Sequence, residues 1–284
     1  MSGLPDTRRR AACGAAANAT GRRSRPSSVA GLRPDSRDSP RFGRNHKGGW
    51  SHLTKTQGMV DATSLRRVPL FRDFEDAELS AIASAISNRR YPKHQFVVRE
   101  SEPGDTFFIV VSGSVSVCRI APDGRETILS ILKEGDFFGE MSMFDSSLRS
   151  ASIKTLTEVE VGAVHRNDFL DLMDRNPKIG RLLVIALSER LRAANALIAA
   201  TTSQDIRARL ASLLLNLADQ FGEAVANGTR ITLRLTNQEM ANMIGTTRET
   251  VNRTLNRFWD EQLVDMRTSH VVVVEPEKLR ALIP

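Results

Sequence analysis

The chain has 284 residues, a formal net charge of +7 and a sequence pI near 10.0. The length predicts about two domains, each large enough to bury a core. The positive charge is confined to one end: residues 1–58 hold 12 Lys and Arg against 3 Asp and Glu, whereas residues 59–284 carry a net −2. No apolar run approaches 18 residues, which excludes a transmembrane helix. We therefore expect a cytoplasmic protein without a membrane partner, and the overall charge says little about its folded part.

Cysteine and histidine usage argues against metal and redox centres. The chain has two cysteines, too few for a disulfide framework, a Cys-rich metal site or the four ligands of an iron–sulfur cluster. The histidines show no metal-ligand spacing, no catalytic grouping and no Cys/His arrangement suited to haem: His46, His52, His94, His165 and His270. The sequence thus predicts no metal, no haem and no iron–sulfur cluster.

Residues 1–58 are rich in Arg, Gly, Ser and Pro and have no apolar period. Such a segment cannot bury enough surface to offset chain entropy, so we expect a disordered basic tail. It lacks the apolar region of a secretory signal. It fits a basic arm, a transit-like peptide or an over-long translated start; the last is favoured slightly, because the ordered pattern begins just after Met59.

The first folded unit, residues 63–176, changes texture after Tyr91-Pro92. Before that point, from Leu65 to Arg89, apolar residues at spacings of three and four predict helix. After it, short apolar runs are separated by Gly- and Asp-containing turns, which is typical of an antiparallel sandwich or jelly roll. The runs are QFVVRE, TFFIVVSGSVSVCRI, ETILSIL and VEVGAV.

One segment, DFFGEMSMFDSSLRSASIKT, does not fit a plain strand–turn–strand scheme. Gly139 before a short helical turn would leave free N–H groups that attract an anion. Arg149 would add a bidentate phosphate partner and Ser150 a hydroxyl donor, while Glu140 suits a sugar hydroxyl. Alternatively, Glu140 and Arg149 pair with each other and pin the loop.

The stretch from YPKHQFVVRESEPGDTFF to GEMSMF and RSA resembles the cyclic-nucleotide-binding domain of the CRP/FNR transcription regulators, and the likeness extends from about Leu65 to the C-terminus. The resemblance implies that Glu140 contacts the ribose 2′-hydroxyl and that Arg149 and Ser150 hold the cyclic phosphate. The cassette residues it assigns to the ligand are Gly139, Glu140, Met141, Arg149, Ser150 and Ala151.

Residues 177–204 predict a long helix, with Asn176 as N-cap and Pro177 at its first position. A narrow apolar stripe at 3-4-3-4 spacing favours a self-partner, although packing on the helix's own domain is the alternative. The stripe consists of Val184, Leu187, Leu191, Ala194 and Ile198. Family members bind the adenine of cyclic AMP from such a helix through Thr followed by Ser or Asn. This chain has Ala194-Asn195 there, so Asn195 keeps an amide while the hydroxyl is missing.

Residues 205–284 read as a winged helix-turn-helix domain. Thr236 and Glu239 form a capping box, Gly245 permits a tight turn, and Val251 begins the apolar stripe of the next helix. The segment LVDMRTSHVVVV predicts the hairpin of the wing.

The second helix of such a motif places its N-terminal residues on base edges of the major groove. Arg248, Glu249, Asn252 and Arg253 share the face opposite the apolar stripe, although Glu249 could instead complete a capping box from Thr246. The family's recognition pattern R-E-[ST]-V-x-R matches RETVNR. This match implies base reading of TGTGA-like inverted repeats by Arg248, Glu249 and Arg253. Positioning contacts would come from Thr236, Thr246, Thr247 and Asn252.

Taken together, these features predict an α+β protein: an N-terminal antiparallel β jelly-roll domain, a long dimerisation helix and a C-terminal winged helix-turn-helix domain. The predicted function is a homodimeric DNA-binding regulator controlled by cyclic AMP, with RNA polymerase as a partner. The segment 222–229 is the candidate polymerase contact. The alternative keeps the DNA binding but makes the effector domain vestigial or differently liganded. An enzyme is not expected, because the last 80 or so residues are taken up by the helix-turn-helix.

Overall fold

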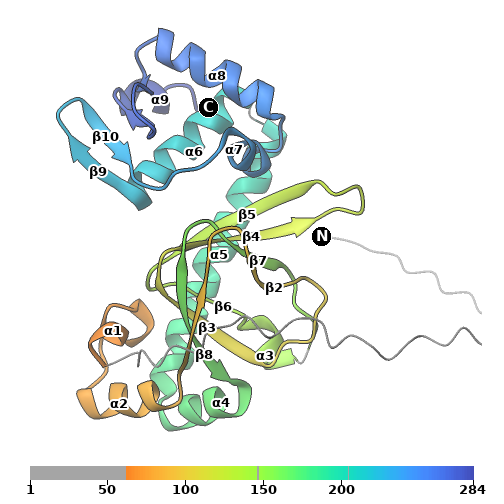
Figure 1. The fold of residues 1–284 in the computed structure, drawn as a ribbon, viewed down its shortest axis with the longest axis vertical. Coiled ribbons are helices and arrows are strands. Elements are labelled where there is room, and N and C mark those ends of the chain that lie inside the picture. Colours follow the sequence, from red (N-terminus) through yellow and green to blue (C-terminus); the bar gives the residue numbers. More distant parts are fainter. Residues whose placement is uncertain (1–61, 146, 204) are drawn as a thin grey trace, which may run out of the picture. The chain divides into compact units, whose positions relative to one another are not determined.

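The computed structural model describes residues 62–145, 147–203 and 205–284 (Figure 1). The expectations for residues 1–58, including the alternative start at Met59, lie outside the described residues. None of the helices in the described ranges is long and apolar enough to cross a membrane.

The described chain begins with three short helical elements: α1 (Ala62–Arg66), a 3-10 turn η1 (Pro69–Phe71) and α2 (Asp76–Ser84). Leu79 and Ile82 of α2 are buried, as the periodicity predicts. The expected continuation of helix to Arg89 is wrong, because residues 87–91 form strand β1 (Ser87–Tyr91). This strand pairs antiparallel with β8 (Val159–His165). Its polar sequence gave no strand signal, and the pairing is supplied by a segment about 70 residues away.

Two four-stranded antiparallel sheets form the effector domain, which confirms the jelly-roll expectation. The first has the order β1-β8-β3-β6 and the second β2-β7-β4-β5. The remaining strands are β2 (Phe96–Val98), β3 (Thr106–Ser112), β4 (Ser114–Ile120), β5 (Glu126–Lys133), β6 (Phe137–Phe138) and β7 (Ser152–Thr155). Buried side chains from both sheets, including Phe108, Val115 and Val161, form one apolar cluster. The sandwich is therefore a closed core that can hold a surface loop rigidly.

Cys118 lies on β4 and is fully buried. Burial, followed by the nearby Glu126 carboxylate, raises the pKa of the Cys118 thiol to about 12. Lys154 of β7 and Glu126 of β5 form a half-buried ion pair at 3.2 Å, and these two strands flank β4 in the sheet. The thiol is therefore protonated and a poor nucleophile at neutral pH.

Helix α4 (Arg166–Arg175) leads into the long helix α5 (Pro177–Ser203), which starts at Pro177 as predicted. Asn176 stands at the N-cap position before Pro177, where its carbonyl accepts from the Ile179 N–H at 3.0 Å, and its own N–H bonds the Leu172 and Met173 carbonyls and closes α4. The first turns of α5 pack into the effector domain through buried Ile179 and Leu183. Further along α5, Val184, Leu191 and Ile198 are 64%, 63% and 65% exposed.

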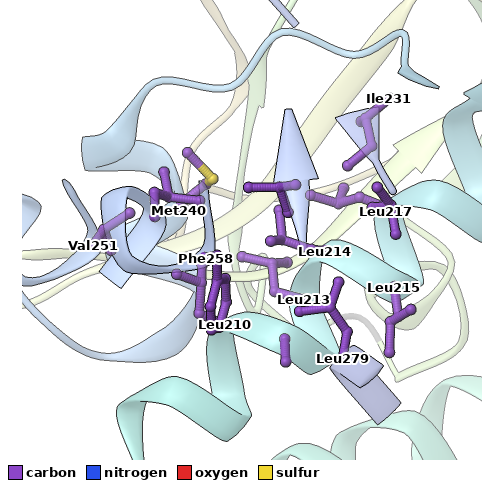
Figure 2. Close-up of a cluster of buried hydrophobic side chains, with 14 of the residues drawn as sticks. Leu210, Leu213, Leu214, Leu215, Leu217, Ile231, Met240, Val251, Phe258 and Leu279 are labelled. Atoms are coloured by element: carbon purple, nitrogen blue, oxygen red, sulfur yellow. The ribbon is translucent and has the colours of Figure 1, made fainter. Parts of the chain in front are cut away.

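The C-terminal domain contains α6 (Ile206–Phe221), α7 (Asn237–Ile244), α8 (Arg248–Asp260), α9 (Pro276–Arg280) and the sheet β11-β12-β10-β9. Its strands are β9 (Gly222–Val225), β10 (Gly228–Ile231), β11 (Val264–Asp265) and β12 (Val272–Val273). Figure 2 shows the core, where Leu210 and Leu214 of α6 meet Met240 of α7 and Val251 and Phe258 of α8. The stripe predicted for the recognition helix is thus its buried face.

Candidate nucleotide site and nucleic-acid interface

The cassette segment begins with a glycine that no other residue could replace easily. Gly139 has φ +87°, and the short helix α3 (Met141–Asp145) follows it. A Cβ at this position would lie 2.6 Å from Nη1 of Arg149 and 2.8 Å from the Thr106 carbonyl oxygen. Glycine therefore allows both the left-handed backbone and the close approach of the Arg149 side chain.

Arg149 is held inside the cassette and is only 7% exposed. Its Nη1 donates to the Gly139 carbonyl at 3.0 Å and to Ser142 Oγ at 2.9 Å, and Nη2 donates to the Thr106 carbonyl at 2.8 Å. Among the described residues these bonds use three of the five guanidinium N–H groups. Two N–H groups remain, which matches the two free oxygens of a cyclic phosphodiester.

A second glycine, Gly104, also packs directly against the Arg149 guanidinium. A Cβ on Gly104 would approach Nε of Arg149 to 2.4 Å and Ser142 Oγ to 2.5 Å. From the sequence, Gly104 is predicted only to lie in a turn between two strands. Nothing in the residues around Gly104 indicates that it will contact Arg149, which lies 45 residues later. The role of Gly104 at this site was therefore not predicted.

Glu140 is 5% exposed, and its carboxylate pairs with Arg190 of α5 rather than with Arg149. Arg190 Nη1 lies 3.1 Å from Glu140 Oε1, and Nη2 donates to the Phe137 carbonyl at 2.5 Å. The alternative of a Glu140–Arg149 pair is therefore wrong. Arg190 was not among the expected site residues, because a single Arg on a long helix has no pattern that links it to a loop 50 residues earlier.

The remaining expected ligand residues occupy more open positions. Ser150 is exposed, and its hydroxyl donates to Met141 Sδ at 3.4 Å; Met141 is itself 53% exposed. Ala151 is half-buried at the end of the cassette, and Asn195 is exposed on α5. These four side chains are more exposed than Arg149, and among the described residues they form no hydrogen bond with it, unlike the Gly139 carbonyl and the Ser142 hydroxyl.

Charge around the cassette is balanced by acidic neighbours. Burial lowers the pKa of Arg149, and the carboxylates of Asp105, Glu140 and Glu102 oppose that change. The pKa of Asp105 is itself lowered, first by the hydroxyl of Thr106. Such an arrangement keeps a positive group in a mostly buried place, where an anionic ligand gains most from it.

In the C-terminal domain, the predicted capping box and turn are present. Thr236 accepts from the Glu239 N–H while the Glu239 carboxylate accepts from the Thr236 N–H, and both bonds cap α7. Gly245 ends α7 in the left-handed conformation, with φ 67° and ψ 51°. Thr247 caps α8 by accepting from the Thr250 N–H. Glu249 is therefore the second residue of α8, and the alternative capping box from Thr246 does not form.

The polar face of α8 is open. Arg248, Glu249, Asn252 and Arg253 are all exposed, and within the described residues neither arginine has a carboxylate partner at ion-pair distance. Hydrogen bonds to its own backbone N–H and from Thr247 lower the pKa of Glu249, which keeps it an acceptor. This face offers donors and an acceptor of the kind that read base edges.

The other expected contact residues lie beside this face. Asn252 Oδ1 accepts from Asn237 Nδ2 of α7 at 3.1 Å, so the two helices are joined on the open side. Thr246 is half-buried and its N–H bonds the Ala241 carbonyl in the turn, while Thr247 is exposed. No group of three or more potential metal ligands is found in the described ranges.

The fold and the two sites define a transcription regulator in which a cyclic nucleotide-binding domain is joined to a helix-turn-helix. Family models agree: a cyclic nucleotide-binding domain matches residues 88–176, and a Crp-like helix-turn-helix domain matches residues 208–282. The CRP-like cAMP-activated global transcriptional regulator of Mycobacterium tuberculosis is 34% identical over 215 residues, which cover 76% of this chain and 96% of that protein. The chain therefore belongs to the CRP/FNR family of transcription regulators.

Other relatives support the same assignment. The cAMP-activated regulator CRP of Escherichia coli O6:H1 is 31% identical, with coverage of 70% of this chain and 94% of that protein. Among solved structures, the c-di-GMP responsive regulator CLP of Xanthomonas campestris superimposes with a TM-score of 0.62 at 28% identity, covering 70% of this chain and 99% of that one. A CooA mutant from Carboxydothermus hydrogenoformans, at 24% identity, 76% and 94% coverage and a TM-score of 0.65, shares the fold.

Proposed function

We propose that the protein is a homodimeric regulator that binds cyclic AMP in the 139–151 cassette and then binds TGTGA-like inverted repeats. The observation that carries the proposal is Arg149: a buried guanidinium with two N–H groups left over, beside the buried carboxylate of Glu140. Cyclic AMP presents a phosphodiester anion and a 2′-hydroxyl, which these two groups complement. The relatives from M. tuberculosis and E. coli are described as cAMP-activated, which supports this choice of ligand.

In this mechanism Arg190 connects the ligand to the dimer helix. A nucleotide whose 2′-hydroxyl bonds Glu140 competes with, or reorients, the Glu140–Arg190 pair, and Arg190 lies on α5. The ligand can shift the two recognition helices only by favouring one arrangement of α5 over another. The regulator therefore uses the cassette as the sensing end of the long helix.

Dimerisation is proposed because α5 leaves an apolar row uncovered. Val184, Leu191 and Ile198 are spaced by seven residues, and each is more than 60% exposed in the single chain. Such a row is the seam of a two-stranded coiled coil. Light scattering should report a dimer, and Leu191→Glu should shift it to a monomer; a monomeric wild type would contradict the proposal.

The second candidate keeps the DNA binding and changes the effector. Ala194 lies one helical turn beyond Arg190, where the family offers a hydroxyl to the adenine, and an alanine cannot supply one. The structural relative from X. campestris is described as c-di-GMP responsive, so the ligand is not uniform among similar proteins. This candidate predicts weak or absent cyclic AMP binding.

One experiment separates the two. Binding to a duplex with a TGTGA-type inverted repeat should be measured by gel shift without ligand and with cyclic AMP, cyclic GMP or c-di-GMP. Stimulation by cyclic AMP alone supports the first proposal, and Ala194→Thr should then tighten cyclic AMP binding. Equal DNA binding under all conditions favours the vestigial effector domain, while an absence of preference for the repeat contradicts the proposed sequence specificity.

Residues 222–229 remain our proposed contact for RNA polymerase. In the structure they form the exposed hairpin of β9 and β10. An exposed hairpin next to a DNA-binding unit suits a weak protein contact. Substitutions there should reduce transcription activation without changing DNA affinity, which a promoter assay and a gel shift measure separately.

A further inference from the structure

Four of the nine arginines in residues 205–284 are paired with a neighbouring carboxylate. The pairs are Arg207–Glu261, Arg230–Glu223, Arg267–Asp265 and Arg280–Glu277. Arg209 donates instead to the Ile244 carbonyl. Within the described part of this domain, four further arginines have no carboxylate at ion-pair distance: Arg234, Arg248, Arg253 and Arg257. Three of these lie on α8, whereas Arg234 lies in the segment between β10 and α7.

Arg234 has an unusual partner for a cation, because its Nε donates to Nε2 of His270 at 3.1 Å. A ring nitrogen can accept a hydrogen bond only when it carries no proton. Nε2 is therefore unprotonated, and the proton of the neutral ring lies on Nδ1, which faces Ser269 Oγ at 3.4 Å. This pairing leaves the four Nη N–H groups of Arg234 and the hydroxyl proton of Ser269 available on exposed side chains.

Arg234 lies just before α7, the helix that contacts the recognition helix. Arg234 lies two residues before Thr236, the N-cap of α7. Asn237, the first residue of α7, donates a hydrogen bond to Asn252 of α8. His270 lies on the wing, in the segment between β11 and β12. Arg234 thus lies three residues before Asn237, which contacts the open face of α8, and the sugar-phosphate backbone of a bound duplex runs beside that face.

We propose that Arg234, Ser269 and His270 form a binding site for one DNA backbone phosphate, and that His270 takes up a proton when the phosphate binds. The inference rests on the DNA binding of the proposed function. The phosphate would replace His270 as the acceptor for Arg234 and would receive the Ser269 hydroxyl. The ring, no longer required as an acceptor, can then protonate Nε2 and donate to the anion.

The groups facing His270 favour the neutral ring until a phosphate arrives. Arg234 is 3.1 Å away, and Arg230 of β10, paired with Glu223, adds a second cation. The small cavity beside the ring is otherwise lined mainly by apolar side chains of α6, β10 and α7, including Leu214, Ile231 and Met240. Burial first, then Arg234 and Arg230, lower the pKa of His270 in the free protein.

The sign of the pH dependence follows from these charges. A phosphate beside the ring raises the pKa of His270 in the complex relative to the free protein, so the complex binds more protons. DNA affinity therefore rises as pH falls through the interval between the two pKa values, by at most about tenfold per pH unit for one proton.

The test uses the full chain and a fluorescent duplex carrying the inverted repeat, from pH 8 to pH 5.5 at fixed ionic strength. Wild type should bind more tightly toward acid pH, and His270→Gln should remove that dependence. His270 is the only histidine in residues 205–284, so the difference between the two proteins isolates its contribution. A His270→Gln protein with the wild-type pH profile would overturn the inference.

Arg234→Gln should weaken binding to the operator and to a random duplex by similar factors, and should reduce the slope of log K against log salt by about one. Arg267→Gln is the matched control, because this arginine of the same wing is already bonded to Asp265. Equal behaviour of the two variants would overturn the phosphate site.

Calorimetry of wild type in two buffers of different ionisation enthalpy adds a readout that needs no variant. Net proton uptake of up to about one per site near pH 6.5 is expected, and no uptake would contradict the inference. A wild-type protein that binds no duplex at any pH would contradict the DNA-binding proposal itself, and so differs from every outcome above.

Discussion

Arg149 and Arg248 carry the same guanidinium group in opposite surroundings. Arg149 is 7% exposed and has three acceptors in its own chain, while Arg248 is exposed and has no carboxylate partner among the described residues. The first is fixed before any ligand arrives and loses little freedom on binding; the second must order itself and shed water. The comparison teaches that this chain fixes its proposed nucleotide site in advance and leaves the proposed DNA-reading side chains adjustable.

The largest effect should come from removing the fixed guanidinium. Arg149→Ala would delete the phosphate partner and remove the donor that Arg149 provides to the buried Thr106 carbonyl. Loss of one partner of a buried charged pair costs ~2–5 kcal/mol, so cyclic nucleotide affinity should fall roughly 30- to 4,000-fold. Isothermal calorimetry measures this, with the exposed Arg119→Ala as control. Unchanged affinity would show that the cassette does not hold the phosphate through Arg149.

The next prediction tests whether Arg149 must be fixed in place or merely present. Gly104→Ala keeps the arginine but puts a methyl group 2.4 Å from its Nε. The overlap should cost ~1–3 kcal/mol of stability or binding, seen in thermal unfolding and in calorimetry. Gly180→Ala is the matched control, since its Cβ meets only Met173 at 3.5 Å. If both variants behave alike, the fixed geometry of Arg149 has no bearing on binding.

On the adjustable side, Arg248→Ala should cost ~1–3 kcal/mol at its cognate base pair and relax the preference there. Binding to a panel of duplexes, each with one base pair changed, measures the loss position by position. Arg280→Ala, whose charge is matched by Glu277, serves as control. A uniform loss across the panel would make Arg248 a phosphate contact instead of a base reader.

The smallest effect should come from the cap of the same helix. Thr247→Ala removes the oxygen that accepts from the Thr250 N–H at 3.2 Å. Loss of an N-cap costs ~0.5–2 kcal/mol of stability, so the domain should melt earlier and bind all duplexes slightly less tightly. Thr247→Ser should restore the wild-type melting temperature. A changed base preference in Thr247→Ala would instead mean that this side chain reads sequence.

The sequence predicted best where the signals are local. The Thr236 capping box, the Gly245 turn and the buried face of Val251 and Phe258 involve residues within a few positions of each other, and the structure contains all of them. Helix caps and apolar periodicity act over one or two turns of chain, so they can be read without knowing the fold.

In the cassette, contacts between residues far apart in the sequence could not be predicted. Its ends, Gly139-Glu140 and Arg149, were identified from their chemistry, yet Gly104 and Arg190 were missed. These two residues meet the cassette from 45 positions away and from another helix, and only the folded sandwich brings them together. Strand β1 was missed for a similar reason, since its polar residues bond Glu160 of a distant strand.

The buried thiol of Cys118 makes the protein convenient for optical measurements. A chain that starts at Met59 contains no other cysteine, and a fully buried thiol with a pKa of about 12 reacts slowly with maleimides at neutral pH. A single cysteine introduced at the exposed Trp259 of α8 would therefore take a dye alone. In the proposed dimer, energy transfer between the two labelled subunits would then follow the separation of the recognition helices as cyclic AMP is added.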